Sequence, residues 1–314
     1  MPSNLSNVLT SVLPILMLIA LGMVLRRARG LDDAGVTGLK QLIVSVSLPA
    51  VLFTTFLSTR FEPQHLWVIV IVFAVCLGML GVGHLYTRLV GGSIYTPFLF
   101  TGFELGMIGF ALFTAVYGSG ELPALGVLAL GHEVFIWFVF VTLLRAAGSQ
   151  RSSVAATARS LATSPTIIAI VLGLALNLTG LSVQLGQGPV GGAVMATLKY
   201  LAAVIVPMVL LIVGYGSRLS WPDVQAALPL VLTRLLVAVA LALAIGSLVF
   251  DGILGLAPIY RHALFTLMVL PPPFIIPQFI PRERRDDITY ATNVVSLYAL
   301  ASVAVFVGYV LITS

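Results

Sequence analysis

Charged residues are scarce in this chain of 314 residues, since Asp, Glu, Lys and Arg together make up 9% of it. Hydrophobic residues make up 59%, and the mean hydropathy is +1.11. A soluble domain of this length carries more polar side chains, because its surface must be solvated by water. The composition therefore excludes a soluble protein and predicts an integral membrane protein.

Cysteine is also nearly absent. The single cysteine, Cys76, lies in an apolar run, and the four histidines are far apart in the sequence. Neither a disulfide nor the ligand spacing of a zinc or iron–sulfur site follows from this pattern. The phosphate-binding sequence Gly-x-x-x-x-Gly-Lys-Ser/Thr is missing too. We therefore expect no metal, no cofactor, no ATP hydrolysis and no enzyme activity.

Ten apolar runs are long enough to cross a bilayer as helices, which takes about 20 residues. We expect these spans at residues 8–25, 39–57, 66–88, 94–117, 122–144, 165–181, 190–215, 228–250, 258–281 and 289–312. Short links with charges or turn-forming residues separate them. The fold class predicted is an all-α membrane protein, with the lipid bilayer as a partner.

The basic residues predict how the spans are oriented. If the N-terminus is outside, thirteen of the 16 basic residues fall on inner loops or inner span ends: Arg26, Arg27, Arg29, Lys40, Arg88, Arg145, Arg151, Arg159, Arg218, Arg234, Arg282, Arg284 and Arg285. Only Arg60 and Arg261 fall outside, and Lys199 lies within a span. This positive-inside bias places both termini outside. It also explains the net charge of +5 without a nucleic-acid partner.

Two halves of five spans each are indicated by weak internal similarity. Pro14 precedes Gly22 by eight residues, and Pro165 precedes Gly173 by the same distance. Pro49 interrupts the second span, and Pro207 interrupts the seventh. An odd number of spans per half inverts the second half, which predicts an inverted repeat. We expect a first repeat at 1–148, a cytoplasmic linker at 149–164 and the second, inverted repeat at 165–314.

The fourth and ninth spans carry helix-breaking residues at their centres. The fourth contains Glu104-Leu-Gly-Met-Ile-Gly109, and the ninth contains Pro271-Pro-Pro-Phe-Ile-Ile-Pro277. Glycine and proline interrupt helices, and in hydrocarbon such interruptions persist only where other groups satisfy the freed backbone. Paired broken helices predict the binding site of a transporter.

Three stretches resemble the auxin efflux carrier family, which is related to the bile-acid/sodium symporters. They are Pro14-Ile-Leu-Met-Leu-Ile-Ala-Leu-Gly22, Ser47-Leu-Pro-Ala-Val-Leu-Phe53 and Pro165-Thr-Ile-Ile-Ala-Ile-Val-Leu-Gly-Leu-Ala-Leu-Asn177. The resemblance runs through essentially the whole chain. It implies ten transmembrane helices in two inverted repeats, with broken helices 4 and 9 crossing at mid-membrane. Helices 1, 2, 6 and 7 would form a scaffold, often dimeric, and helices 3–5 and 8–10 a moving transport core.

The chain departs from this family at the crossing. Glu104 stands where the family usually has Asn, Ala111 where it has Pro, and Ile275 where it has a second Asn. From the breaks and the resemblance, we expect the substrate-binding residues to be Glu104, Gly106, Met107, Ile108, Gly109, His132, Glu133, Pro271, Pro272, Pro273, Phe274, Ile275, Pro277 and Asn293. Backbone N–H groups at Gly106–Gly109 and Phe274–Pro277 could hold an anion through the helix dipole.

Three ionisable residues inside spans are candidates for charge coupling: Glu104, Glu133 and Lys199. A charge at the bilayer centre costs about 2.5–3.5 kcal/mol on insertion scales, so it usually has a partner. Lys199 is the expected counter-ion of Glu104 or Glu133, either fixed or formed in one access state only. It could instead receive a substrate carboxylate. His132 and Glu133 are adjacent, so they point about 100° apart, and Trp137 lies one turn beyond Glu133.

The function expected is secondary transport of a small organic anion, a carboxylate, by an elevator-type mechanism in a homodimer. The alternatives are a carrier of a cationic or other non-carboxylate solute that uses Glu104, and a membrane ligand sensor built on a transporter scaffold. The coupling ion, if there is one, would be H⁺ or Na⁺. Short loops and the excess of Arg over Lys favour a bacterial inner membrane.

Overall fold

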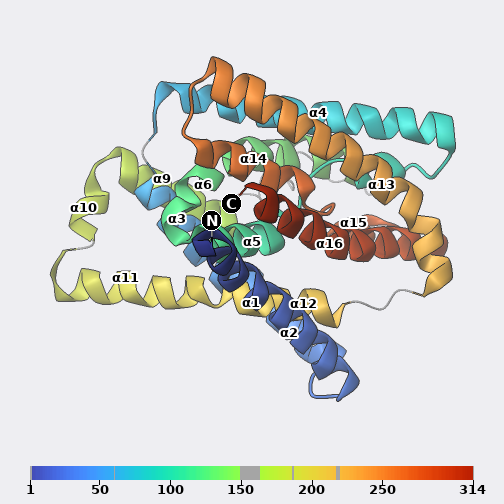
Figure 1. The fold of residues 1–314 in the computed structure, drawn as a ribbon, viewed down its shortest axis with the longest axis horizontal. Helices are drawn as coiled ribbons and strands as arrows, with labels where there is room; N and C mark the ends of the chain where they lie inside the picture. The colour runs from blue at the N-terminus through green and yellow to red at the C-terminus, as the bar shows by residue number, and fades with distance from the viewer. Residues whose placement is uncertain (1, 60, 149–162, 186, 217–219, 314) are drawn as a thin grey trace.

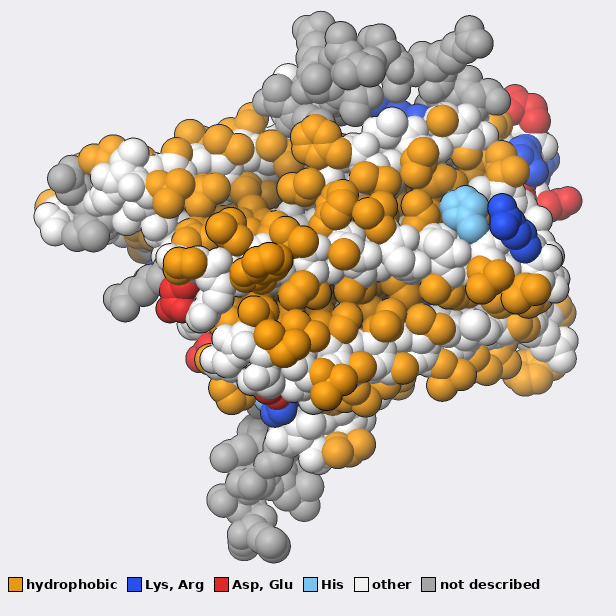
Figure 2. Space-filling model, turned by 90° about the horizontal axis from the view of Figure 1, so that it is seen from above, with side chains coloured by type: hydrophobic (Ala, Val, Ile, Leu, Met, Phe, Trp, Pro, Cys, Tyr) orange, Lys and Arg blue, Asp and Glu red, His pale blue; other side chains and the backbone are white. Residues whose placement is uncertain are grey.

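The computed structural model describes residues 2–59, 61–148, 163–185, 187–216 and 220–313. These residues form helices and connecting loops, and none of them lies in a β-strand (Figure 1). Six continuous helical stretches are long and apolar enough to cross a membrane: Asp33–Ser58, Pro63–Val90, Ser119–Ala147, Gly188–Tyr215, Trp221–Ile253 and Arg285–Thr313. Hydrophobic side chains are spread over most of the face drawn in Figure 2, and charged side chains lie near its margins. The structure is therefore that of an all-α protein with membrane character.

The α-helices are α1 (Pro2–Arg27), α2 (Asp33–Leu42), α3 (Leu48–Ser58), α4 (Pro63–Val90), α5 (Phe110–Tyr117), α6 (Leu122–Phe135), α7 (Val141–Ala147), α9 (Pro165–Leu178), α10 (Leu181–Leu185), α11 (Gly188–Ala203), α12 (Ile205–Tyr215), α13 (Trp221–Ala244), α14 (Pro258–Val269), α15 (Ile276–Phe279) and α16 (Arg285–Thr313). Short 3₁₀ turns (η2, Thr96–Leu99; η4, Ser119–Glu121) and π-helical turns (η1, Ile43–Ser47; η3, Leu105–Gly109; η5, Ile136–Phe140; η6, Ile245–Ile253) adjoin them.

The six stretches long enough to cross a membrane cover six of the ten predicted spans, namely 39–57, 66–88, 122–144, 190–215, 228–250 and 289–312. Helices α1 and α9 overlap the predicted spans 8–25 and 165–181, while the predicted spans 94–117 and 258–281 are each divided into shorter helices, so a total of ten membrane-spanning helices stays a prediction. Most of the expected linker at 149–164 lies outside the described residues, as do Arg60, Arg151, Arg159 and Arg218. The orientation that these arginines helped to predict stays a prediction.

Local signals fix where several helices begin. The Asp32 carboxylate accepts a hydrogen bond from the Gly35 N–H and caps α2. Ser220 and Asp223 form a reciprocal capping box at the start of α13. Such caps satisfy N–H groups that have no partner within the helix. Proline in the first turn of α4, α9 and α14 supports the same starts, since it lacks an N–H that would need a partner.

Two helix pairs touch through glycines that the sequence singles out. Gly22 of α1 packs on α12, where an added Cβ would lie 2.2 Å from the Leu211 carbonyl oxygen. Gly173 of α9 packs on α3, where an added Cβ would lie 2.7 Å from the Phe53 carbonyl oxygen. Small residues allow such close backbone approach between membrane helices. The two contacts correspond, because Leu211 follows Pro207 by four residues and Phe53 follows Pro49 by four.

Two further pairs of helices are in contact. Helix α4 packs against α6, and α13 packs against α16. In Figure 1, α4 and α13 run along one side of the molecule and α11 and α12 along the other, with α5, α6, α14 and α16 between them. This arrangement brings the predicted fourth and ninth spans into the interior.

The glycine contacts predict a stability difference. Gly22→Ala and Gly173→Ala should each lower the melting temperature in detergent, because overpacking typically costs about 1–3 kcal/mol. Gly308→Ala in α16 is the matched control, since an added Cβ there meets nothing within 4 Å. It should leave the melting temperature unchanged or raise it slightly, because alanine favours a helix more than glycine does. Equal melting temperatures for the three variants would contradict the packing described.

Candidate functional site

Two stretches without regular helical structure meet inside the protein. The first, residues 100–104, separates η2 from η3, and the second, residues 270–275, separates α14 from α15. We call them the first and second unwound segments. The Glu104 N–H donates to the Pro271 carbonyl at 2.9 Å, and the Phe274 N–H donates to Glu104 Oε2 at 2.7 Å. The two segments are therefore joined directly by hydrogen bonds.

The sequence of each segment suits this junction. Three consecutive prolines, Pro271 to Pro273, remove three N–H donors, so the second segment cannot continue the helical ladder of α14. Gly102 has a φ of +68°, which favours glycine, and a Cβ there would lie 2.9 Å from Pro273 Cγ. Glycine on one segment and proline on the other thus permit close contact.

A buried arginine satisfies the carbonyl groups that the two segments expose. Arg234 of α13 has no exposed surface. Its guanidinium donates to the carbonyl oxygens of Leu99 and Gly102, both at 2.7 Å, and to that of Leu270 at 3.3 Å. These three carbonyls lie at or beside the interruptions, where a helix leaves acceptors without partners. Leu270 also caps the C-terminus of α14, where the helix dipole favours a cation.

Aromatic rings complete the surroundings of Arg234. The guanidinium carbon lies 4.7 Å from the ring centre of Tyr298 and 5.3 Å from that of Phe103. Among the described residues, no carboxylate forms an ion pair with Arg234. The buried cation is therefore stabilised by peptide dipoles and ring faces. This corrects the expectation that Arg234 is a charge at an inner span end, since the side chain lies in the protein interior.

His132 and Glu133 are also tied to the first unwound segment. His132 is buried, and its Nε2 accepts a hydrogen bond from the Phe103 N–H at 3.0 Å. Its Nδ1 lies 3.2 Å from Glu133 Oε1, while Trp137 Nε1 donates to Glu133 Oε2 at 3.0 Å. Trp137 thus lies on the face of Glu133, as predicted. The adjacent His132 and Glu133 side chains contact each other.

The backbone N–H groups of Phe274–Pro277 were expected to bind an anion. A side chain of the protein itself binds there. The Phe274 N–H is taken by the carboxylate of Glu104, and α15, which follows, is only four residues long. Glu104 therefore fills the position that we expected a bound anion to take. Gly106 to Gly109 lie within π-turn η3, where Gly106 packs against the Leu48 side chain and Gly109 against Leu105 and Leu270.

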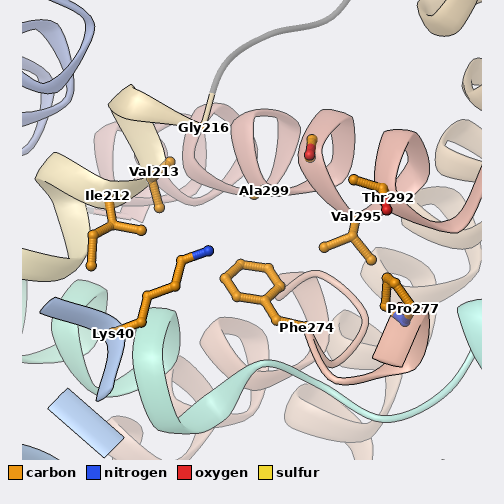
Figure 3. A pocket seen from close by; sticks show the side chains of 10 residues that line it. Lys40, Ile212, Val213, Gly216, Phe274, Pro277, Thr292, Val295 and Ala299 are labelled. Carbon is orange, nitrogen blue, oxygen red and sulfur yellow. The ribbon is translucent and has the colours of Figure 1, made fainter. Parts of the chain in front are cut away.

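A cavity of about 160 Å³ lies beside the second unwound segment. It is lined by Lys40, Ile212, Val213, Gly216, Phe274, Pro277, Thr292, Val295, Ser296 and Ala299 (Figure 3). The Lys40 side chain extends into the cavity, and its ammonium group ends beside the Phe274 ring. Within the described residues, this ammonium group has no hydrogen-bond or ion-pair partner. Lys40 is exposed, as Lys199 is, but unlike Lys199 it lines this cavity, where a ligand can reach its charge.

Of the predicted binding residues, Phe274 and Pro277 line this cavity. Glu104 touches its wall through the Phe274 N–H. Asn293 instead donates to Asp223 Oδ1 at 2.8 Å, while its neighbours on α16 face the cavity. The remaining predicted binding residues do not line it: Gly106, Met107, Ile108, Gly109, His132, Glu133, Pro271, Pro272, Pro273 and Ile275.

The expected counter-ion role of Lys199 is not seen in this conformation. Lys199 is exposed on α11, a helix on which no residue is buried. In the described part of the chain it forms no ion pair with Glu104 or Glu133. The two carboxylates have other partners, namely the Phe274 N–H for Glu104, and His132 and Trp137 for Glu133.

Lys40, Arg234 and Thr292 are the polar residues of the cavity and the junction that the sequence analysis did not assign to the site. Lys40 and Arg234 had been counted only as orienting charges. Each nevertheless lies inside a predicted apolar span (39–57 and 228–250), and a cation within a span usually faces the protein interior or a cavity. Thr292 carries no comparable signal, whereas Ser296 is a polar residue within the predicted span 289–312, as Asn293 is.

Comparison with known proteins adds no assignment, because no protein-family model and no curated protein sequence matches the chain. Among the described residues, no cluster of three or more His, Cys, Asp or Glu side chains could hold a metal ion.

Arg234→Met tests the role of the buried guanidinium. This change should destabilise the protein strongly, because each buried acceptor left without a donor costs about 1–3 kcal/mol. Arg234→Lys should recover only part of the loss, since an ammonium group lacks the planar fork of donors. Thermal unfolding in detergent measures both effects.

Arg261→Met is the control for this experiment. Arg261 forms an ion pair with Asp251, and its side chain is 39% exposed, so its loss should cost only about 0–1 kcal/mol. If Arg234→Met melted at the same temperature as Arg261→Met, the guanidinium would not hold the unwound segments.

Proposed function

We propose that this protein is a secondary carrier of a small organic anion, a carboxylate, which binds in the cavity beside the second unwound segment. The observation that carries the proposal is the Lys40 ammonium group, which extends into that cavity and forms no hydrogen bond or ion pair with any residue that the structure describes. An unpaired cation in a largely apolar pocket favours a ligand of opposite charge. Thr292 and Ser296 place two hydroxyl groups in the same lining.

The position of Glu104 supports an anion rather than a cationic solute. Oε2 of its carboxylate accepts from the Phe274 N–H behind the cavity wall, and Glu104 itself is absent from the lining. A cationic substrate would instead face the positive charge of Lys40. The cavity volume of about 160 Å³ suits a small ligand.

The helix pairing supports an inverted repeat. Exchanging the two halves relates α1 to α9, and the Pro49 helix to the Pro207 helix. The Gly22–Leu211 contact then corresponds to the Gly173–Phe53 contact, each formed four residues after the equivalent proline. In the same way, the pair α4 and α6 corresponds to α13 and α16. On this proposal, the unwound segments are the interruptions of crossing helices 4 and 9.

The location of the cavity supports alternating access. Its walls come from α2 and α12 on one side, and from the second unwound segment, α15 and α16 on the other. In the proposed architecture the first group belongs to the scaffold and the second to the transport core. A site at the boundary between two bodies can open to either side of the membrane when one body moves. An inner membrane location, both termini outside and a homodimer complete the proposal.

Uptake of labelled small carboxylates into proteoliposomes tests this function. The wild-type protein should give saturable uptake, and Lys40→Met should reduce it at least about tenfold, since a hydrogen bond to a charged group contributes about 1.5–3 kcal/mol. Lys40→Arg should retain part of the activity. Lys199→Met is the matched control and should transport like wild type, because Lys199 lies on the exposed helix α11.

Three results would contradict the proposal. Uptake of organic cations but not of carboxylates would favour the alternative solute class. Tight carboxylate binding without any flux would favour a sensor. Equal uptake by Lys40→Met and Lys199→Met would remove Lys40 from the binding site.

A further inference from the structure

We infer that His132 and Glu133 form a proton-binding site, and that proton uptake there drives the carrier by releasing the first unwound segment. This inference rests on the proposed function for its link to transport. Its structural part, a proton site connected to the unwound segment, stands on the contacts of His132 alone.

The hydrogen bonds of His132 fix the position of its proton. A backbone N–H can only donate, so Nε2, which faces the Phe103 N–H at 3.0 Å, must be unprotonated. The ring proton is therefore on Nδ1, which donates to Glu133 Oε1 at 3.2 Å. Glu133 accepts a second hydrogen bond from Trp137 Nε1, which suits an ionised carboxylate. The imidazole in this conformation is neutral.

A proton added to His132 can only go to Nε2. The ring then becomes an imidazolium with two N–H donors, whose charge the adjacent Glu133 carboxylate balances. The Phe103 N–H loses its acceptor and faces another N–H group instead. A buried donor without a partner is unfavourable, so the first unwound segment must move or find a new acceptor. Histidine is the side chain that ordinarily changes its charge near neutral pH.

This change has a short path to the cavity. Phe103 precedes Glu104, whose N–H binds Pro271 and whose carboxylate binds the N–H of Phe274. Phe274 lines the cavity beside Lys40. Displacing Phe103 therefore disturbs the hydrogen bonds that join the two unwound segments. The Glu133 side chain is 21% exposed, which gives protons an entrance that buried His132 lacks.

The charged groups around the pair act in opposite directions on an imidazolium. Glu133 on the same helix and Glu104 on the first unwound segment are the nearby acids. Arg234 on α13 lies across the Phe103 ring, 5.3 Å from its centre, and repels an imidazolium. Cys76 on α4 is buried and uncharged.

The other helices packed on α6 add no charge at this point. On α14, the residues Tyr260, Arg261 and His262 bind His65, Asp251 and Tyr309, respectively. On α5, the ring of Tyr117 stacks on His262. Helix α3 contains no residue that titrates near neutral pH. The electrostatic potential at the His132 ring is thus set mainly by Glu133, Glu104 and Arg234.

Trp137 reports proton binding without any transport assay. Trp67→Phe with Trp221→Phe removes the other two tryptophans, which are 62% and 71% exposed. In this background, Trp137 emission should change in one step as the pH is lowered. His132→Asn should abolish the step, because asparagine keeps a hydrogen-bonding group but binds no proton. Glu133→Gln should move the step to lower pH, because the imidazolium loses the carboxylate that balances its charge. A flat signal in the background protein, or an unchanged step in both variants, would overturn the proton site.

Uptake measurements then test the coupling. An inward proton gradient should stimulate carboxylate uptake by wild type and by the control His84→Asn, whose histidine binds the Leu80 carbonyl elsewhere on α4. His132→Asn should lose this stimulation. If it is stimulated as strongly as wild type, the coupling role is wrong. If wild type takes up no carboxylate at all, the proposed function fails, while the Trp137 titration still decides whether the proton site exists.

Discussion

The structure depends on one buried guanidinium group that binds carbonyls from two interrupted helical regions. Without Arg234, the oxygens of Leu99, Gly102 and Leu270 would face an apolar interior with no donor. Water can satisfy such groups at a protein surface, but hydrocarbon cannot. The cation in turn needs these peptide dipoles, since no carboxylate in the described chain forms an ion pair with it. The two unwound segments and Arg234 thus stabilise one another.

The N–H groups at the same junction are satisfied by a complementary set of side chains. Glu104 accepts from Phe274, and His132 accepts from Phe103. A carboxylate therefore stands where a helix N-terminus could have bound a substrate anion, and the positive charge in the cavity comes from Lys40 instead. The Lys40 charge in the cavity interacts electrostatically with Glu104 at the junction, and Phe274 forms a wall that both share. A change at one can therefore reach the other.

Sequence patterns predicted the helices and missed much of the site, for physical reasons. The Pro–Gly spacings identified Gly22 and Gly173, because helices that pack closely need a small residue at the point of contact. Lys40 and Arg234 were counted among the basic residues that orient the spans. The sequence around a cation near a span end is the same whether the side chain faces water, lipid or a cavity. Lys199 was expected to pair with a carboxylate inside a span, and within the described residues it does not. The sequence of a uniformly apolar helix does not indicate which of its faces is buried, so this could not be foreseen. Contacts between residues far apart in sequence, such as Arg234 with Leu99, leave no local pattern.

The most direct test of the account is the accessibility of the cavity from the two sides of a membrane. Ser296→Cys in a Cys76→Ala background places a single thiol in the cavity lining. In oriented proteoliposomes, membrane-impermeant thiol reagents should label it from either side, and a transported carboxylate should slow both reactions. Labelling from one side only, whatever ligand is present, would contradict a carrier in which the cavity opens alternately to each side.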